Sequence, residues 1–406
     1  MNTPMKIAGA RGALRVAVVT ETYPPEVNGV ARTVGLMVEA LLARRHEVQL
    51  VRPRQGRESV PPPDQGLRER LVPGFAIPFY RHLQIGLASP SMLHREWSQW
   101  RPDLVHVVTE GPLGWAAVSA ARRLAIPVCS DFHTNFHSYS QHYGFGMFSG
   151  AVTRYLRSLH NRADCTLVPT AEMRANLEAL AFERVAVVGR GVDTQLFNPA
   201  RRSECLRAAW GCSGSQTVAL HVGRIAPEKN LGLFVDAALG MQAIDPKVRV
   251  VLVGDGPQGP ALRNRHPEFV FAGMRTGEDL AEHYASADVF LFPSVTETFG
   301  NVTLEAMASG LAVVACDYAA AQQYLRHGAS GLLAPQGDTA EFIAMAAQLA
   351  RNRDLRLRFG VEARRAAEAA SWDRAFDELE RVLRNIAGTV RAEADGTRGE
   401  SAHVET

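Results

Sequence analysis

The chain has 406 residues and a formal net charge of +2, with 46% hydrophobic and 21% charged residues. These values are ordinary for a soluble globular protein, and the length suits two domains better than one core. No apolar run approaches the roughly 20 residues that span a bilayer, and the five cysteines lack C-x-x-C spacing. We therefore expect a cytoplasmic protein without membrane spans, a disulfide framework or a zinc site.

The first half of the chain alternates short apolar runs with amphipathic helical stretches. The first run contains Arg15 and is interpreted as a strand rather than a signal peptide. A charged, proline-rich segment at 52–66 is expected to be an exposed loop. Six buried strands are predicted, at 14–21, 46–53, 104–110, 127–133, 165–170 and 185–192.

The second half repeats this architecture after a linker at 197–215 that is marked by Pro, Gly and Ser. Runs of this kind, separated by helical stretches, indicate βαβ units and parallel sheets covered on both faces. We expect an α/β protein of two doubly wound, Rossmann-like domains. Five more strands are predicted, at 217–224, 249–256, 269–274, 288–294 and 311–317.

The last periodic element has one apolar stripe, at Trp372, Phe376, Leu379, Leu383 and Ile386. We therefore predict domains at 1–196 and 197–371, a helix at 372–388 and a disordered polar tail at 389–406.

Ligands of open α/β sheets bind outside the carboxyl ends of the strands, so residues there are site candidates. Gly29 lies between the first strand and a helix whose N-terminus offers N–H groups to an anion. His133 ends the strand at 127–133 and would project toward a ligand. His137 could pair with it on a metal, but no acidic third ligand has suitable spacing, so no metal is expected.

Arg224 and Lys229 follow the first strand of the second domain and can neutralise a diphosphate. Lysine is rare in this chain, which otherwise uses arginine, and the sequence contains no D-x-D pair for Mg²⁺. A departing diphosphate would then be stabilised by cations and backbone N–H groups without a metal or other cofactor. A solvated turn with an internal ion network is the alternative interpretation.

The stretch ETFGNVTLEAMASG places Glu297 in the loop after a strand and Glu305 in the following helix. Phe299, Gly300 and Asn301 open that helix, and Gly300 lets the backbone approach a phosphate. Glu305 can accept hydrogen bonds from a ribose diol, while Glu297 can meet hydroxyls beyond the phosphates. Each glutamate would thus bind a different part of one sugar nucleotide.

The run GDGPQG satisfies G-x-G-x-x-G at Gly254–Gly259 and could bind a dinucleotide. It follows the second strand of its domain, however, and Pro257 and Pro260 remove N–H groups that a pyrophosphate would use. A dinucleotide site is therefore disfavoured.

Several motifs together resemble the family-4 retaining glycosyltransferases of the GT-B fold, over about residues 14–387. They are Glu297-x7-Glu305 and the stretches 28–51, 223–230 and 251–257. The stretches 21–34 and 131–136 are most similar to bacterial GDP-mannose-dependent α-mannosyltransferases and glycosyl-diacylglycerol synthases. The resemblance implies two domains facing across a cleft: 1–196 binds the acceptor, 197–371 binds the nucleotide sugar, and 372–388 returns to the first domain.

The resemblance also assigns residues. It implies that Arg224 and Lys229 hold the donor diphosphate, Glu305 the ribose and Glu297 the donor sugar. Phe299, Gly300 and Asn301 would complete the donor site.

His133 would lie beside the reacting sugar, and Gly29 would touch the phosphate or acceptor. The sequence departs from the family pattern at Asn28 and Arg45, where glycine is usual.

The implied activity is metal-independent, retaining transfer of a hexose, with mannose favoured, to a hydroxyl of a lipid or lipid-linked glycan. GDP-mannose or UDP-glucose would be the donor, and a UDP-glucose-type glycolipid synthase is one alternative. A sugar-nucleotide 2-epimerase is another, but it needs first-domain carboxylates that we do not identify from the sequence. A non-catalytic nucleotide-sugar binding module is disfavoured because the site residues are complete.

The acceptor surface is less defined. The helical stretch 145–162 is basic and amphipathic, so it could lie on anionic lipid, although a helix that covers a sheet has the same pattern. The first half of the chain is also the more basic half, which supports a peripheral protein on the cytoplasmic face of an anionic membrane. No nucleic-acid-binding module is recognised.

Overall fold

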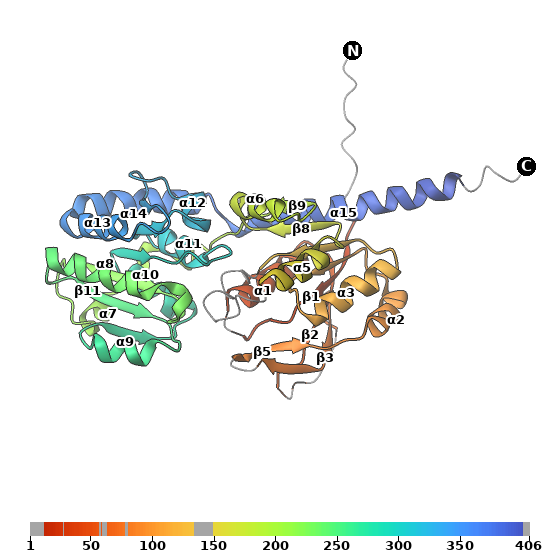
Figure 1. Cartoon of the computed structure of the whole chain (residues 1–406), viewed down its shortest axis with the longest axis horizontal. Helices are drawn as coiled ribbons and strands as arrows, with labels where there is room; N and C mark the ends of the chain where they lie inside the picture. Colours follow the sequence, from red (N-terminus) through yellow and green to blue (C-terminus); the bar gives the residue numbers. More distant parts are fainter. Residues whose placement is uncertain are drawn as a thin grey trace, which may run out of the picture.

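The structure is a computed structural model that describes residues 12–26, 28–56, 58, 63–77, 80–133 and 149–400. Two α/β domains lie side by side, and the last helix runs along the first domain (Figure 1). The expected pair of parallel-sheet domains is confirmed.

The first domain is built on a seven-stranded parallel sheet of order β3-β2-β1-β6-β7-β8-β9. All six predicted strands are present. Its strands are β1 Arg15–Val19, β2 Glu47–Pro53, β3 Leu67–Val72, β6 Leu104–Val107, β7 Val128–Asp131, β8 Cys165–Val168 and β9 Val185–Val187. Its helices are α1 Gly29–Ala43, α2 Pro90–Trp100, α3 Pro112–Arg123, α5 Ser149–His160 and α6 Ala171–Ala179.

Three first-domain strands were not predicted. β3 forms the edge of the sheet, and its sequence LRERLV has three consecutive charged residues, which interrupt the apolar run expected of a buried strand. β4 (Gly74–Ile77) and β5 (Tyr80–Gly86) form a separate antiparallel pair. Of the proline-rich segment, Arg52 and Pro53 belong to β2, while residues 57 and 59–62 lie outside the described residues.

The second domain has a six-stranded parallel sheet of order β12-β11-β10-β13-β14-β15. Its strands are β10 Val218–Val222, β11 Arg249–Val253, β12 Val270–Gly273, β13 Val289–Phe292, β14 Ala312–Cys316 and β15 Leu332–Ala334. Only β15, three residues long, was not predicted. Its helices are α7 Glu204–Ala209, α8 Leu231–Ile244, α9 Gly259–Arg265, α10 Gly277–Ala285, α11 Asn301–Ala308, α12 Ala319–Tyr324, α13 Thr339–Arg351 and α14 Arg353–Glu368, with short 3₁₀ turns η2 Pro199–Arg201 and η3 Pro227–Lys229.

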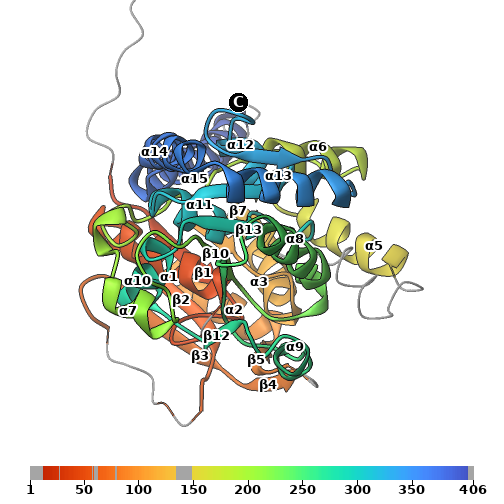
Figure 2. The ribbon, with the colours of Figure 1, turned by 90° about the vertical axis from the view of Figure 1, so that its left-hand side faces the viewer.

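Both sheets are buried on both faces, which explains their continuous apolar strands. Val218 and Leu220 of β10 pack with α10, α11 and α14, whereas Ala219 between them packs with α8 and α13 on the opposite face. Helices surround the second sheet in the end-on view (Figure 2). This packing fixes the carboxyl ends of the strands and therefore the loops that carry the site.

The chain crosses between the domains twice, along two adjacent segments. Val192 N donates to Ala370 O at 2.9 Å, and a Cβ on Gly191 would lie 2.2 Å from Trp372 N, so this contact requires glycine. α15 (Trp372–Glu400) then packs Phe376 and Leu383 into the first-domain core. The helix extends past residue 388, where we expected the tail to begin; residues 401–406 lie outside the described residues.

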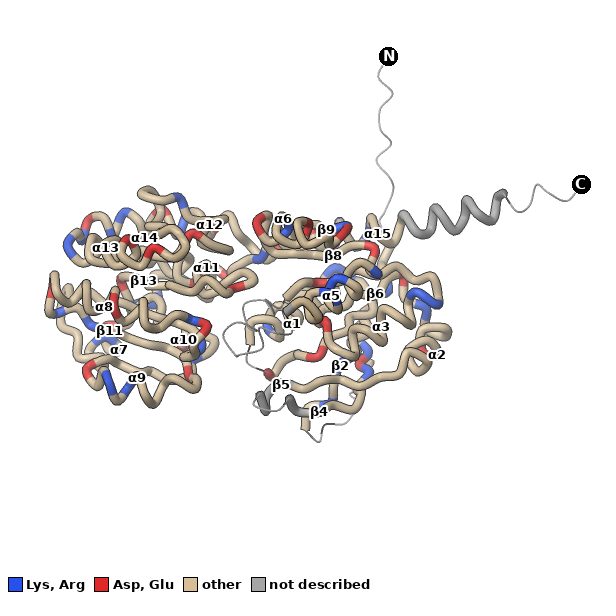
Figure 3. The backbone as a smooth tube through the Cα atoms, viewed as in Figure 1, with Lys and Arg blue, Asp and Glu red and all other residues tan. Residues whose placement is uncertain are grey.

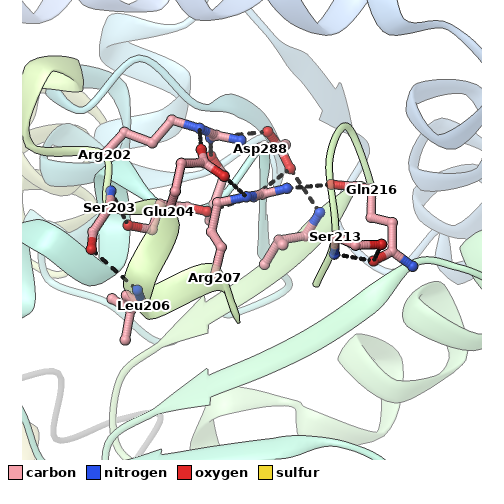
Figure 4. A network of polar contacts seen from close by, with 11 residues as sticks. Arg202, Ser203, Glu204, Leu206, Arg207, Ser213, Gln216 and Asp288 are labelled. Atoms are coloured by element: carbon pink, nitrogen blue, oxygen red, sulfur yellow. Dashed lines mark hydrogen bonds and ion pairs between the residues drawn. The ribbon is translucent and has the colours of Figure 1, made fainter. Parts of the chain in front are cut away.

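The predicted linker contains η2 and α7 and is anchored by a polar network (Figure 4). The guanidinium of Arg207 is buried and donates to Ser286 O at 2.8 Å, Gln216 O at 2.5 Å and Asp288 Oδ2 at 3.2 Å. Arg202 also contacts Asp288, at 3.2 Å. The network therefore joins the linker to the amino-terminal edge of the second sheet.

We expect Arg207→Met to lower the free energy of unfolding by about 2 kcal/mol, because two carbonyl groups lose a charged donor. In this variant Asp288 still contacts Arg202 and still accepts from the Val218 N–H, which limits the loss of stability. Urea denaturation measures the change, and Arg365→Met, at an exposed ion pair on α14, is the control. Equal unfolding midpoints for the two variants would contradict the anchoring role.

Candidate active site

Lys229 and Glu297 form a largely buried ion pair at the carboxyl end of the second sheet. Lys229 lies in η3 after β10, and Glu297 lies in the loop after β13. Ser294 Oγ donates to Glu297 Oε1 at 2.9 Å. Burial favours the protonated carboxyl, but the charge and hydrogen bonds of Lys229 and Ser294 hold the pKa of Glu297 below its ordinary value. Glu297 is therefore a carboxylate at neutral pH.

The two loops are also joined through Glu228. Its carboxylate contacts Arg224 Nη1 at 3.3 Å, and its backbone oxygen accepts from Thr296 Oγ1 at 2.8 Å. The Glu228 side chain is buried, whereas that of Arg224 is 37% exposed. The structure thus brings Arg224, Lys229 and Glu297 together.

Glu305 lies in α11, and each of its carboxylate oxygens has a partner. Tyr284 Oη donates to Oε2 at 3.0 Å, and Arg32 Nη1 of α1 donates to Oε1 at 2.5 Å. Burial and the charge of Glu305 raise the pKa of Tyr284 well above its ordinary value, so its hydroxyl stays a donor. Arg32 and Tyr284 were not identified from the sequence, because neither has a motif spacing relative to Glu305.

The amino-terminal ends of α1 and α11 face each other between the domains. A Cβ on Gly29 would lie 3.9 Å from Asn301 Nδ2. The Asn301 Oδ1 atom is buried without a hydrogen-bond partner among the residues the structure describes. Gly300 has φ of 87°, a left-handed conformation that explains glycine at this turn. The two facing helix amino-termini suit an anionic group between them, whereas the Asn301 Oδ1 atom is an acceptor and suits a donor group of a ligand.

Three neighbouring residues support this geometry. Phe299 is buried and packs edge-to-face on Tyr324, so its ring stabilises the turn from the core side. Asn28 replaces the usual glycine and caps α1 by accepting from Ala31 N at 2.8 Å. Arg45, the other departure from the pattern, keeps the left-handed backbone of a glycine, with φ of 63°.

His133 belongs to a buried network of hydrogen bonds and ion pairs in the first domain. Arg190 Nη2 donates to His133 Nδ1 at 2.6 Å, so Nε2 carries the proton and donates to Asp131 Oδ2 at 3.0 Å. His106 Nε2 contacts the other oxygen of Asp131 at 2.7 Å. Because both ring nitrogens are engaged, His133 is a fixed, oriented group and does not accept a substrate proton in this arrangement.

The electrostatics agree with this assignment. Burial and the charge of Arg190 lower the pKa of His133, which keeps the imidazole neutral. Burial would raise the pKa of Asp131, but His106 and His133 together lower it below its ordinary value. Burial lowers the pKa of Arg190 to about 10, so the guanidinium remains charged at neutral pH. His137 lies outside the described residues.

The first domain also carries two carboxylates that sequence reasoning missed. Glu21 follows β1 and accepts from Leu113 N at 3.2 Å; Glu110 follows β6 and accepts from His133 N at 3.4 Å. Burial, with a smaller contribution from the charge of Glu110, raises the pKa of Glu21 to about 7. Both residues could have been identified from the sequence, because each lies at the carboxyl end of a predicted strand.

Comparisons with known proteins agree with the fold. The model described as "Glycosyltransferase Family 4" matches residues 27–196, and "Glycosyl transferases group 1" matches residues 216–352. The chain is 37% identical to a GDP-mannose-dependent alpha-mannosyltransferase of Mycobacterium tuberculosis, over 90% of this chain and 95% of the relative. It is 28% identical to an alpha-monoglucosyldiacylglycerol synthase of Streptococcus pneumoniae, over 74% of this chain and 71% of the relative.

Solved structures share the fold at low sequence identity. Sucrose-phosphate synthase from Thermosynechococcus elongatus has a TM-score of 0.75 at 18% identity and covers 93% of this chain and 100% of its own. A glycosyltransferase from Rickettsia africae has a TM-score of 0.72 at 15% identity, with coverage of 93% and 99%. The two-domain arrangement is the GT-B fold.

Proposed function

The chain belongs to glycosyltransferase family 4, and from this membership we propose that it transfers mannose from GDP-mannose to a hydroxyl of a lipid or lipid-linked glycan. The proposed reaction retains the anomeric configuration and needs no metal. As a glycosyltransferase, the protein is not the epimerase considered from the sequence, even though first-domain carboxylates are present.

The observation that carries the proposal is the set of ion pairs at the carboxyl end of the second sheet. Arg224 and Lys229 would bind the donor diphosphate together with the N–H groups at the start of α11. Glu305 would accept from the ribose hydroxyls, and the ionised Glu297 would accept from hydroxyls of the donor sugar. The diphosphate, the ribose and the sugar of the donor would thus each contact a different group of neighbouring side chains.

In the proposed step, the acceptor oxygen bonds to the anomeric carbon on the face from which the phosphate leaves. The bond from that carbon to the phosphate oxygen breaks, and the acceptor proton passes to the departing phosphate. Arg224 and Lys229 stabilise the charge that develops on the diphosphate. His133, held by Arg190 and Asp131, would form a rigid wall beside the sugar rather than act as a base.

The donor preference follows the mannosyltransferase relative, which is the more similar one. The glucolipid-synthase relative favours a second candidate, transfer of glucose from UDP-glucose to a lipid on the same site. Both candidates share the diphosphate and ribose contacts, so the nucleotide base distinguishes them.

A lipid acceptor would bring the protein to the cytoplasmic surface of a membrane as a peripheral protein. Helices long and apolar enough to cross a bilayer are absent from the part of the chain that the structure describes. α5 by itself does not argue for lipid contact, because Leu156 and Leu159 pack into the first domain and Arg157 donates to Leu180 O at 3.2 Å. Basic and acidic residues are interspersed over both domains in Figure 3.

Thermal-shift titration with GDP, UDP, ADP and NAD⁺ in EDTA tests the proposal, because a ligand of the native state raises the melting temperature. We expect GDP to stabilise the protein and Glu305→Gln to weaken GDP binding about tenfold, through loss of a charged acceptor. Glu341→Gln, at an exposed position on α13, is the control. Preference for UDP would favour the glucolipid synthase, and stabilisation by NAD⁺ alone would refute both candidates.

A further inference from the structure

Arg32 connects the two domains at the candidate donor site. It lies in the first turn of α1, and its Nη1 atom donates to Glu305 Oε1 of α11 at 2.5 Å, across 273 positions of sequence. Its guanidinium also lies over the ring of Phe197, 5.5 Å from the centroid. The Arg32 side chain is 39% exposed, whereas that of Glu305 is 7% exposed. One side of the guanidinium is thus open to solvent while the carboxylate is enclosed.

This contact occupies the group that the proposed function gives to the ribose. Tyr284 already donates to one oxygen of Glu305, and Arg32 donates to the other. A ribose diol that binds this carboxylate must therefore share the Oε1 atom with Arg32 or replace it. A carboxylate released by Arg32 stays hydrogen-bonded to Tyr284, and the ribose hydroxyls supply further donors, so the exchange does not leave it unpaired.

The charges in the site favour the movement of Arg32 from Glu305 to the diphosphate. Arg224, Lys229 and Arg32 are each paired with a glutamate, namely Glu228, Glu297 and Glu305, so the formal charges of the three pairs cancel. An incoming diphosphate is anionic and needs cations that have been released from carboxylates. In a sugar nucleotide the diphosphate is attached to the ribose, so a guanidinium that leaves Glu305 has a phosphate oxygen beside it.

The placement of α1 supports this step. Gly29, one turn before Arg32, lies next to Asn301 at the start of α11, where the diphosphate would bind. A guanidinium suits this role because its planar N–H groups match either a carboxylate or a phosphate.

We propose that Arg32 is a donor-binding residue that exchanges Glu305 for the diphosphate of the sugar nucleotide. The inference rests on the proposed function, because it needs a nucleotide diphosphate in this site. It adds a cation from the first domain to the two from the second. When the donor binds, Arg32 contacts the diphosphate from the first domain, whereas Arg224 and Lys229 contact it from the second domain.

The test compares GDP with guanosine, which has the ribose but no phosphate. Dissociation constants are measured for the wild type, Arg32→Met and Arg32→Lys, by calorimetry for GDP and by NMR titration for guanosine. We expect Arg32→Met to weaken GDP about tenfold and to leave guanosine unchanged or bound more tightly. Arg32→Lys keeps the charge and should recover part of the GDP affinity. Arg174→Met, at an exposed pair on α6, is the control, and melting curves confirm that each variant is folded.

Each outcome decides the matter. GDP binding that is unchanged in Arg32→Met would overturn the inference while leaving the proposed function intact. An equal gain in affinity for GDP and guanosine would also overturn it, since Arg32 would then only compete with the ribose. A wild-type protein that fails to bind GDP and UDP would overturn the proposed function and the inference with it.

Discussion

Replacing Lys229 by methionine should lower kcat/KM for the nucleotide sugar by about 10²- to 10³-fold, the loss typical of one electrostatic stabiliser of developing charge. The effect has two causes. The departing diphosphate loses a cation, and Glu297 loses the partner that keeps it ionised in a buried position. The steady-state rate of sugar transfer with GDP-mannose and a lipid acceptor measures the effect.

A matched control is available because the chain has few lysines. Lys247 is exposed in the turn before β11, at the opposite end of the strands from the candidate site. Lys247→Met should leave kcat/KM within about twofold, as surface substitutions usually do. If Lys229→Met retained the wild-type rate, the diphosphate would have to be stabilised elsewhere and the assignment of the site would be wrong.

Asp131→Asn should lower the free energy of unfolding by about 3 kcal/mol, the cost of removing one partner from a buried charged network. Asp131 accepts from both His106 and His133, and an asparagine oxygen can replace only one of its two carboxylate acceptors. Arg190, which reaches Asp131 through His133, would also lose its counter-charge. Urea denaturation near pH 7 measures the loss.

The pH dependence of this loss follows from the sign of the shift. The pKa of Asp131 is lowered in the folded protein, so its stabilising contribution is complete above the unfolded value of about 3.9 and is lost as the pH falls below it. The difference between wild type and variant should therefore shrink below about pH 4. Asp377→Asn, whose side chain is 70% exposed and pairs with Arg44, should change stability by less than about 1 kcal/mol. A pH-independent difference would show that Asp131 acts through packing rather than charge.

Local sequence was sufficient for most of the fold. Mostly apolar runs such as 14–21 and 288–294 predicted buried strands, because a parallel strand covered on both faces has few polar positions. β3 was missed because its edge position allows three consecutive charged residues, which interrupt the apolar run.

For the site, the sequence by itself determined the groups that follow strand ends in the second domain. Arg224, Lys229, Glu297 and Glu305 could be found because chain direction in a parallel sheet brings such loops to one edge. The tertiary structure decided their partners. Whether Glu305 meets Arg32, 273 positions away, depends on how α1 packs against α11, and no local pattern encodes that distance.

The same reason explains the role of His133. Its place after a strand made it a site candidate, but its chemistry depends on Arg190, a residue from another strand end 57 positions later. Only the packed sheet brings that guanidinium to Nδ1 and thereby fixes the tautomer, because a buried imidazole takes its protonation from the groups around it.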